Sequence, residues 1–237
     1  MNVGSDFDRR QRYLDKNMKH IFFSILSVLT FSFCQTADTA KKRSFDCYVR
    51  FLEPERQIHA EATLREGDTN PQPVQPPGNI LYQGKEMKLI TTPAVSYRLD
   101  KSGGFDQQHV FAWKDEKGQS QQFEMQLSPI TKFGFGTKEL SRQHTATMRW
   151  EGEPLAKGEA LVFLWENAAL HKTVPMEIIN TSGKAIIEFP AAKIAQLDPG
   201  EWTYYLVRKK LTKSDTNGVA ASGIIEYYTK VDTVEVK

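Results

Sequence analysis

The stretch 57–66, QIHAEATLRE, shows the pattern that decides the fold of this chain. Its apolar side chains occupy every second position, and they are Ile58, Ala60, Ala62 and Leu64. Successive side chains of a β-strand point to opposite sides of the sheet, so this alternation predicts a strand with one buried and one solvated face. Residues 121–127, QQFEMQL, repeat it with Phe123, Met125 and Leu127.

Similar short segments, separated by turn sequences, run from residue 44 to residue 237. The expected strands of the first half are 44–51, 57–66, 79–82, 87–92, 95–99, 109–113 and 121–127. Those of the second half are 145–150, 159–166, 172–179, 184–189, 202–209 and 223–236. Many short strands at this spacing predict an all-β protein built from β-sandwiches. Pro175 cannot donate a ladder hydrogen bond, so 172–179 is expected at a sheet edge.

The strand pattern is interrupted at 131–144, where Gly134 and Gly136 are followed by a polar run. We therefore expect two tandem sandwiches, one at 44–130 and one at 145–237, joined by a linker at 131–144. The segment 68–78, DTNPQPVQPPG, contains four prolines and is expected to be an exposed loop.

The N-terminus has the features of an export signal. Lys19 precedes the uncharged run 21–33, IFFSILSVLTFSF, which is too short to cross a bilayer as a helix. Residues 1–34 are therefore predicted to be a signal segment, with Met1 or Met18 as its start. The small polar residues of 35–43 are predicted to be a flexible tether.

The sequence from Met18 to Cys34 resembles the signal of a bacterial lipoprotein, with Cys34 as the lipid-accepting residue. Phe33 stands where that family has a small residue, and cleavage by an ordinary signal peptidase near Cys34 or Ala37 is the alternative. The resemblance implies a membrane anchor at Cys34 and a location in the periplasm or at the cell surface. Cys47, the other cysteine, is then unpaired and is expected in the core.

The charge distribution argues against nucleic acid as a partner. Five of the 31 basic and three of the 29 acidic residues precede Cys34, which leaves 26 of each sign in the remainder. A neutral body has no overall field that would collect a polyanion.

Residues 197–208, LDPGEWTYYLVR, resemble the turn into the penultimate strand of fibronectin type III and Ig-like domains. The first half, with NILYQGKEMKL, AVSYRL and HVFAW, is similar to the N-terminal β-sandwich of bacterial envelope lipoproteins. Asp38-Thr-Ala40 and Asp232-Thr-Val234 resemble the sites at which some Bacteroidetes glycosylate periplasmic proteins. The resemblances together imply an envelope lipoprotein of the Bacteroidetes type. These resemblances imply a fold and a compartment and bring no catalytic residues.

The sequence contains no HExxH, CxxC, GxSxG, Walker or GxGxxG motif, and its histidines are dispersed. We therefore predict no catalytic residue, no metal ligand set and no cofactor. Aromatic residues are the candidate contacts, because the alternation in 202–209 places apolar side chains on both faces of one strand. The four candidates are Trp202, Tyr205, Tyr227 and Tyr228.

The expected function is that of a non-enzymatic binding or scaffolding protein of the cell envelope. It would contact envelope proteins through loops and edge strands of the sandwiches. One alternative is a carbohydrate-binding surface protein that uses the exposed aromatics. Another is a hydrolase with a site between the two halves. Carboxylate pairs such as Glu151 and Glu153 do not favour it, because any chain this rich in acidic residues offers many such pairs.

Overall fold

The computed structural model describes residues 42–179 and 183–237. The predicted signal segment, the predicted lipid-accepting Cys34 and the tether up to residue 41 lie outside these residues. Strands dominate the described chain, with one short helix, α2 (Ala191–Ile194), which confirms the all-β class. Within the described ranges no helix has the length and apolar character needed to cross a membrane.

Most strands follow the expected segments, but two predictions were wrong: residues 72–74 of the predicted loop form a strand, and so do residues 132–135 and 139–140 of the predicted linker. Each of these short strands pairs with a strand from elsewhere in the chain. The bounds of the first ten are β1 (Arg43–Leu52), β2 (Gln57–Glu66), β3 (Gln72–Val74), β4 (Leu81–Tyr82), β5 (Lys85–Glu86), β6 (Lys88–Ile90), β7 (Ser96–Ser102), β8 (Gln108–Lys114), β9 (Ser120–Gln126) and β10 (Lys132–Phe135). The others are β11 (Glu139–Leu140), β12 (Ala146–Glu151), β13 (Glu159–Asn167), β14 (Lys172–Ile178), β15 (Ile186–Phe189), β16 (Gly200–Thr216), β17 (Val219–Tyr228) and β18 (Asp232–Val236).

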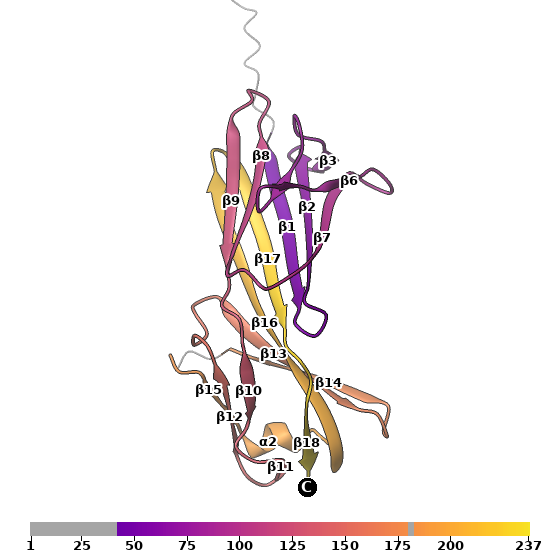
Figure 1. Cartoon of the computed structure of the whole chain (residues 1–237), viewed down its shortest axis with the longest axis vertical. Coiled ribbons are helices and arrows are strands. Elements are labelled where there is room, and N and C mark those ends of the chain that lie inside the picture. Colours follow the sequence, from indigo (N-terminus) through magenta and orange to yellow (C-terminus); the bar gives the residue numbers. More distant parts are fainter. Residues whose placement is uncertain (1–41, 180–182) are drawn as a thin grey trace, which may run out of the picture. The chain divides into compact units, whose positions relative to one another are not determined.

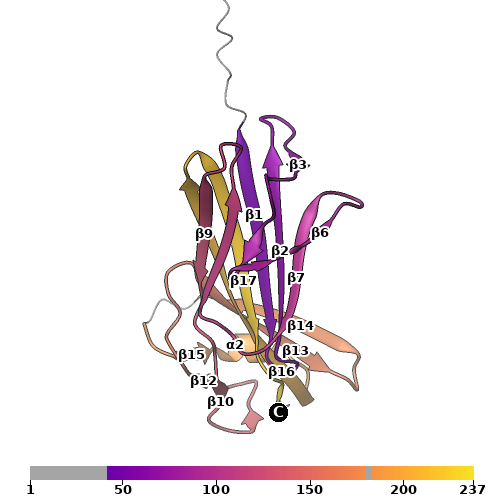
Figure 2. The same cartoon turned by 45° about the horizontal axis from the view of Figure 1, so that its top comes forward.

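Most strands join one large sheet, in the order β11-β18-β16-β17-β1-β2-β7-β6 (Figure 1). The pair β13–β14 branches from β16, and β3 pairs with β2. Two smaller sheets, β5-β4-β8-β9 and β10-β12-β15, complete the described structure. Figure 2 shows β8 and β9 lying across the face of β1 and β17, the arrangement of a sandwich.

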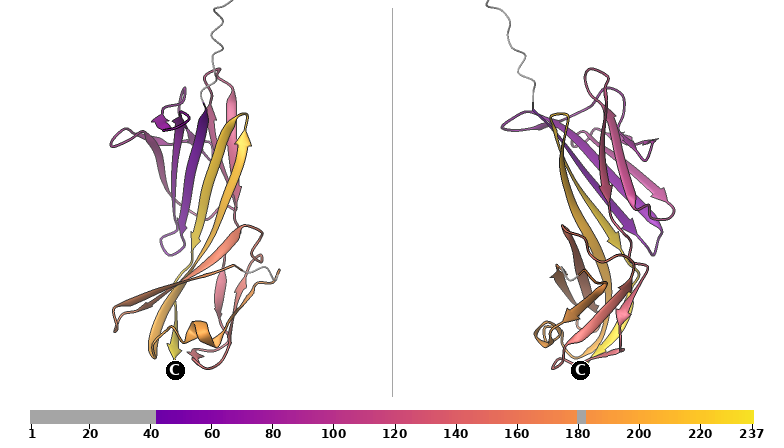
Figure 3. Two further views of the ribbon diagram at one scale, coloured as in Figure 1. Left: turned by 180° about the vertical axis from the view of Figure 1, so that it is seen from behind. Right: turned by 90° about the vertical axis from the view of Figure 1, so that its left-hand side faces the viewer.

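The strand β16 links the two parts of the large sheet, as Figure 3 shows. Its residues 207–216 pair with β17, residues 203–210 pair with β13, and residues 200–204 pair with β18. β17 in turn pairs in parallel with β1, from Arg43 opposite Val219 to Leu52 opposite Tyr228. Strands from both sides of 131–144 thus share one sheet, and residues 42–237 form one compact unit. In this respect the structure differs from the expected pair of self-contained sandwiches.

The first packed region lies between the sheet of β8 and β9 and the strands β1, β2 and β17. Phe45 stacks on Trp113 at a centroid distance of 4.1 Å and meets the edge of Phe123 at 6.2 Å. Gly223 faces the same core, where a Cβ atom would clash with the sulfur of Met125 and lie 2.7 Å from that of Cys47. Glycine is therefore required at 223 by close packing.

The second packed region lies between the sheet of β10, β12 and β15 and the strands β13 and β16. Trp165 stacks on Tyr204 at 4.8 Å, and Phe163 meets Phe189 edge to face at 4.5 Å. Phe135 of β10 closes this cluster against Tyr204 at 5.4 Å. Edge-to-face and offset contacts of this kind add stability beyond burial.

Two local predictions agree with the structure. β14 pairs only with β13 and is an edge strand, with Pro175 opposite Leu164, as the missing N–H of proline requires. Cys47 is buried and free, in the core position that the alternation of β1 indicates.

Candidate functional site

Two of the four predicted contact residues are buried. Trp202 has no exposed surface, and its Nε1–H donates to the backbone oxygen of Asp198 at 2.8 Å. Tyr227 is 3% exposed and packs against Phe51 and Phe105, at 5.3 and 5.0 Å between ring centroids. Both side chains therefore serve the cores, and neither offers a ring to a ligand.

The other two lie together on the outer face of the large sheet. The rings of Tyr205 and Tyr228 are 6.3 Å apart between centroids and inclined by 30°. Each is half-buried, because side chains on this face are covered by no second sheet but are flanked by their neighbours. The structure thus brings Tyr205 together with Tyr228, while Tyr227 points to the opposite face.

A third tyrosine, Tyr48 of β1, belongs to the same face and was not predicted from the sequence. Its hydroxyl donates to Oε2 of Glu226 at 2.6 Å, and the hydroxyl of Tyr228 donates to the same oxygen at 2.9 Å. The parallel pairing of β1 with β17 brings Tyr48 to this carboxylate. No local pattern in the sequence predicts that pairing.

Burial and the shared carboxylate both disfavour ionisation of the two phenols. Burial raises the pKa of Tyr228 to about 12, and the charge and hydrogen bond of Glu226 act in the same direction. Burial together with the Glu226 hydrogen bond also raises the pKa of Tyr48 far above its usual value. The two rings are therefore neutral at physiological pH and are held in place by a charge-assisted hydrogen bond each.

Apolar side chains extend this surface along β16 and β17. Leu211 is 50% exposed and Ile224 is 41% exposed, and the two are directly opposite in the ladder. Ile224 is also opposite Tyr48 in the parallel ladder. We call the surface formed by Tyr48, Tyr205, Leu211, Ile224 and Tyr228 the tyrosine face.

Charged groups lie beside the apolar members of the tyrosine face. Lys209 pairs with Glu177 of β14 at 3.0 Å and lies opposite Glu226 in the ladder. Arg50 lies opposite Glu226 on the other side, from β1. An apolar and aromatic centre with charges around it is the usual composition of a protein–protein interface.

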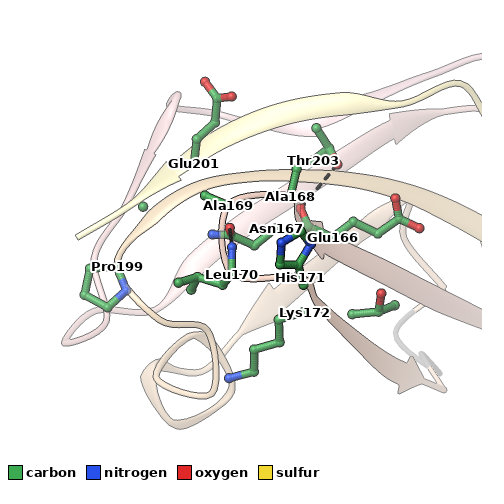
Figure 4. Close-up of a pocket in the computed structure, with 12 residues that line it drawn as sticks. Glu166, Asn167, Ala168, Ala169, Leu170, His171, Lys172, Pro199, Glu201 and Thr203 are labelled. Atoms are coloured by element: carbon green, nitrogen blue, oxygen red, sulfur yellow. Dashed lines mark hydrogen bonds between the residues drawn. The ribbon is translucent and has the colours of Figure 1, made fainter.

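A separate pocket of about 530 Å³ lies at the turn between β13 and β14 (Figure 4). Its polar groups largely satisfy one another: Oδ1 of Asn167 accepts from the N–H of Leu170 at 2.9 Å, and Lys172 pairs with Asp198 at 2.7 Å. His171 and Glu201 belong to the lining, and both side chains are exposed. The arrangement contains no aligned nucleophile and base.

A buried ion pair lies in the region between the two halves of the chain, where a hydrolase would have its site. Arg208 is 1% exposed and donates from Nε to Oε2 of Glu159 at 3.0 Å and from Nη1 to the backbone oxygen of Glu153 at 2.9 Å. The same carboxylate oxygen accepts from the N–H of Ala156 at 3.0 Å. The guanidinium of Arg208 and the carboxylate of Glu159 hold each other in place, which is the role of a structural ion pair.

Two histidines form side-chain hydrogen bonds that the sequence did not indicate. His59, on the outer face of β2, lies between Asp100 at 2.6 Å and Glu61 at 3.0 Å. His109 is fully buried, and its Nδ1 shares a hydrogen bond with the hydroxyl of Tyr82. In the part of the chain that the structure describes, no three His, Cys, Asp or Glu side chains are grouped so as to hold a metal ion.

Neither a family model nor a curated protein sequence matches this chain.

Proposed function

We propose that this chain is a non-enzymatic binding protein of the bacterial cell envelope, anchored through a lipid on Cys34, and that the tyrosine face binds an envelope protein. The observation that carries the proposal is the exposure of Leu211 and Ile224 beside tyrosines whose hydroxyls are fixed by one carboxylate. The signal-like sequence at 1–34 supports the compartment.

The physical case rests on preorganisation. A side chain that is already held in one rotamer loses little entropy when a partner covers it. Tyr48 and Tyr228 are held in this way by Glu226, and tyrosine is among the residues that contribute most to binding energy at interfaces. Leu211 and Ile224 supply apolar area, which gains free energy when a partner removes it from water.

The test is affinity purification of the full-length, membrane-anchored protein with quantitative identification of the envelope proteins that accompany it. The double variant Leu211→Glu/Ile224→Lys is expected to lose at least about 90% of a specific partner, because charges would be buried in the interface. Leu170→Glu is the matched control, since Leu170 is 49% exposed but lies at the β13–β14 turn. A partner retained by the double variant, or lost equally in the control, would contradict the proposal.

A carbohydrate ligand is the second candidate, and the pair Tyr205 and Tyr228 favours it. Two rings inclined by 30° at 6.3 Å offer adjacent aromatic surfaces on which a sugar can stack. Glycan-array binding by the native chain that is lost in Tyr205→Ala would select this function. Array binding that survives Tyr205→Ala would place the sugar elsewhere.

A further inference from the structure

The strand β9 is an open edge in the described structure. It ends the four-stranded sheet β5-β4-β8-β9 and pairs with β8 on one side (Figure 1). On its other side it forms no backbone ladder with a described strand, although β16 and β17 pack close to it. Its side chains alternate regularly: Phe123 and Met125 are buried, whereas Gln122 and Glu124 are exposed. This surface is separate from the tyrosine face.

The hydrogen bonds at the two ends of the β8–β9 ladder show which backbone groups face outward. The N–H of Asp115 donates to the oxygen of Gln119 at 2.9 Å, and the N–H of Leu127 donates to that of Gln107 at 3.0 Å. Hydrogen-bonded and non-hydrogen-bonded pairs alternate in an antiparallel ladder, so the odd-numbered residues of β9 bond to β8. The residues that turn N–H and C=O to the open side are Ser120, Gln122, Glu124 and Gln126.

Other edges of the described sheets have features that discourage pairing, namely a proline, an edge lysine or a length of only two to four residues. Pro175 lies in β14, and β6 has only three residues, beginning at Lys88. Lys213 lies in the part of β16 that pairs with β17 alone. β9, with the sequence SQQFEMQ, has seven residues and contains no proline, glycine or lysine. It is thus a long edge without the usual protection.

We propose that two copies of this chain associate through β9, antiparallel about a two-fold axis at Phe123, to form a continuous sheet. In this register Gln122 lies opposite Glu124 of the second copy, and Ser120 lies opposite Gln126. All four outward residues of each copy then find backbone partners. The glutamine amide and the glutamate carboxylate form a complementary cross-strand pair.

A shift of two residues in either direction keeps the same residues of β9 hydrogen-bonded, but both shifted registers pair less favourable side chains. A shift of two residues in one direction places Glu124 opposite Glu124 of the second copy, which repels. A shift in the other direction moves Gln126 opposite Gly118, beyond the strand. The edge therefore complements itself in one register, which is the reason to name a second copy as the occupant. Because the contact is the same on both copies, it closes at the dimer.

Sedimentation equilibrium of the full chain tests this inference, and a reversible dimer is expected. Gln122→Glu places like charges opposite each other at two symmetric positions and should raise the dissociation constant at least about tenfold. Adding Glu124→Lys to that variant converts both contacts to opposite charges and should restore the dimer. Both residues are exposed, and circular dichroism establishes that each variant is folded.

Glu188→Lys is the control, because Glu188 is exposed on β15 and lies in a different sheet. It should leave the dissociation constant unchanged. A native chain that is monomeric at every concentration overturns the inference. So does a dimer that Gln122→Glu leaves intact, since such a dimer uses another surface.

Discussion

At the scale of single residues, the buried His109 is the ionisable group whose pKa matters most for stability. His109 lies beneath Phe105 and beside Tyr82, with no exposed surface, and its Nε2 has no hydrogen-bond partner among the described residues. Burial lowers the pKa of this imidazole to about 4, against the opposing charge of Asp106. The side chain is therefore neutral in the folded protein down to acidic pH.

This depressed pKa predicts that stability falls on acidification. Between about pH 6.5 and pH 4 the unfolded chain binds a proton at His109 that the folded chain does not, so the free energy of unfolding decreases as the pH falls. The loss attributable to this group is about 3 kcal/mol at most. Urea denaturation across this range checks it, and His109→Asn should flatten the slope. His144→Asn, at an exposed position, should leave the slope unchanged; an equal change in both variants would refute the assignment to His109.

At the scale of the strand, the two-residue repeat decides which aromatic residues are structural and which are available. Tyr227 and Tyr228 are neighbours on β17, yet Tyr227 faces the first packed region and Tyr228 faces the tyrosine face. The same repeat on β16 separates Tyr204, which is buried, from Tyr205. One position along a strand therefore changes the role of an identical side chain.

This division predicts unequal effects for two adjacent substitutions. Tyr227→Ala empties a core position and should cost about 3–5 kcal/mol of unfolding free energy. Tyr228→Ala removes a half-exposed ring and one hydrogen bond and should cost about 1 kcal/mol. Guanidinium denaturation of the two variants, side by side, measures the difference. Equal costs would contradict the orientation of β17.

At the scale of the whole described unit, pairing between distant segments joins the two halves. β1 takes its neighbours from residues 57–66 and from residues 219–228, and the second pairing is parallel. β16 belongs to the ladders of both packed regions. Removing either half would leave long strands with an unpaired side.

The fragment 44–130 is accordingly expected not to fold by itself, because β1 would lose β17, and Phe51 would lose its contact with Tyr227. The intact chain should unfold in a single cooperative transition. Circular dichroism and calorimetry of the fragment and of the intact chain provide the measurement. A fragment that folds cooperatively would re-establish two independent sandwiches.

The sequence alone determined the class of the fold, the positions of most strands and the edge position of the strand with Pro175. It named Trp202, Tyr205, Tyr227 and Tyr228 as candidate contacts without distinguishing the buried from the exposed. These follow from alternation and from the missing N–H of proline, which are local properties. The pairing of β1 with β17, the continuous path of β16 and the carboxylate that joins Tyr48 to Tyr228 were decided only by the tertiary structure. So was the burial of Trp202 and Tyr227, because a repeat of two identifies the two faces of a strand but not which face meets the core when both are apolar.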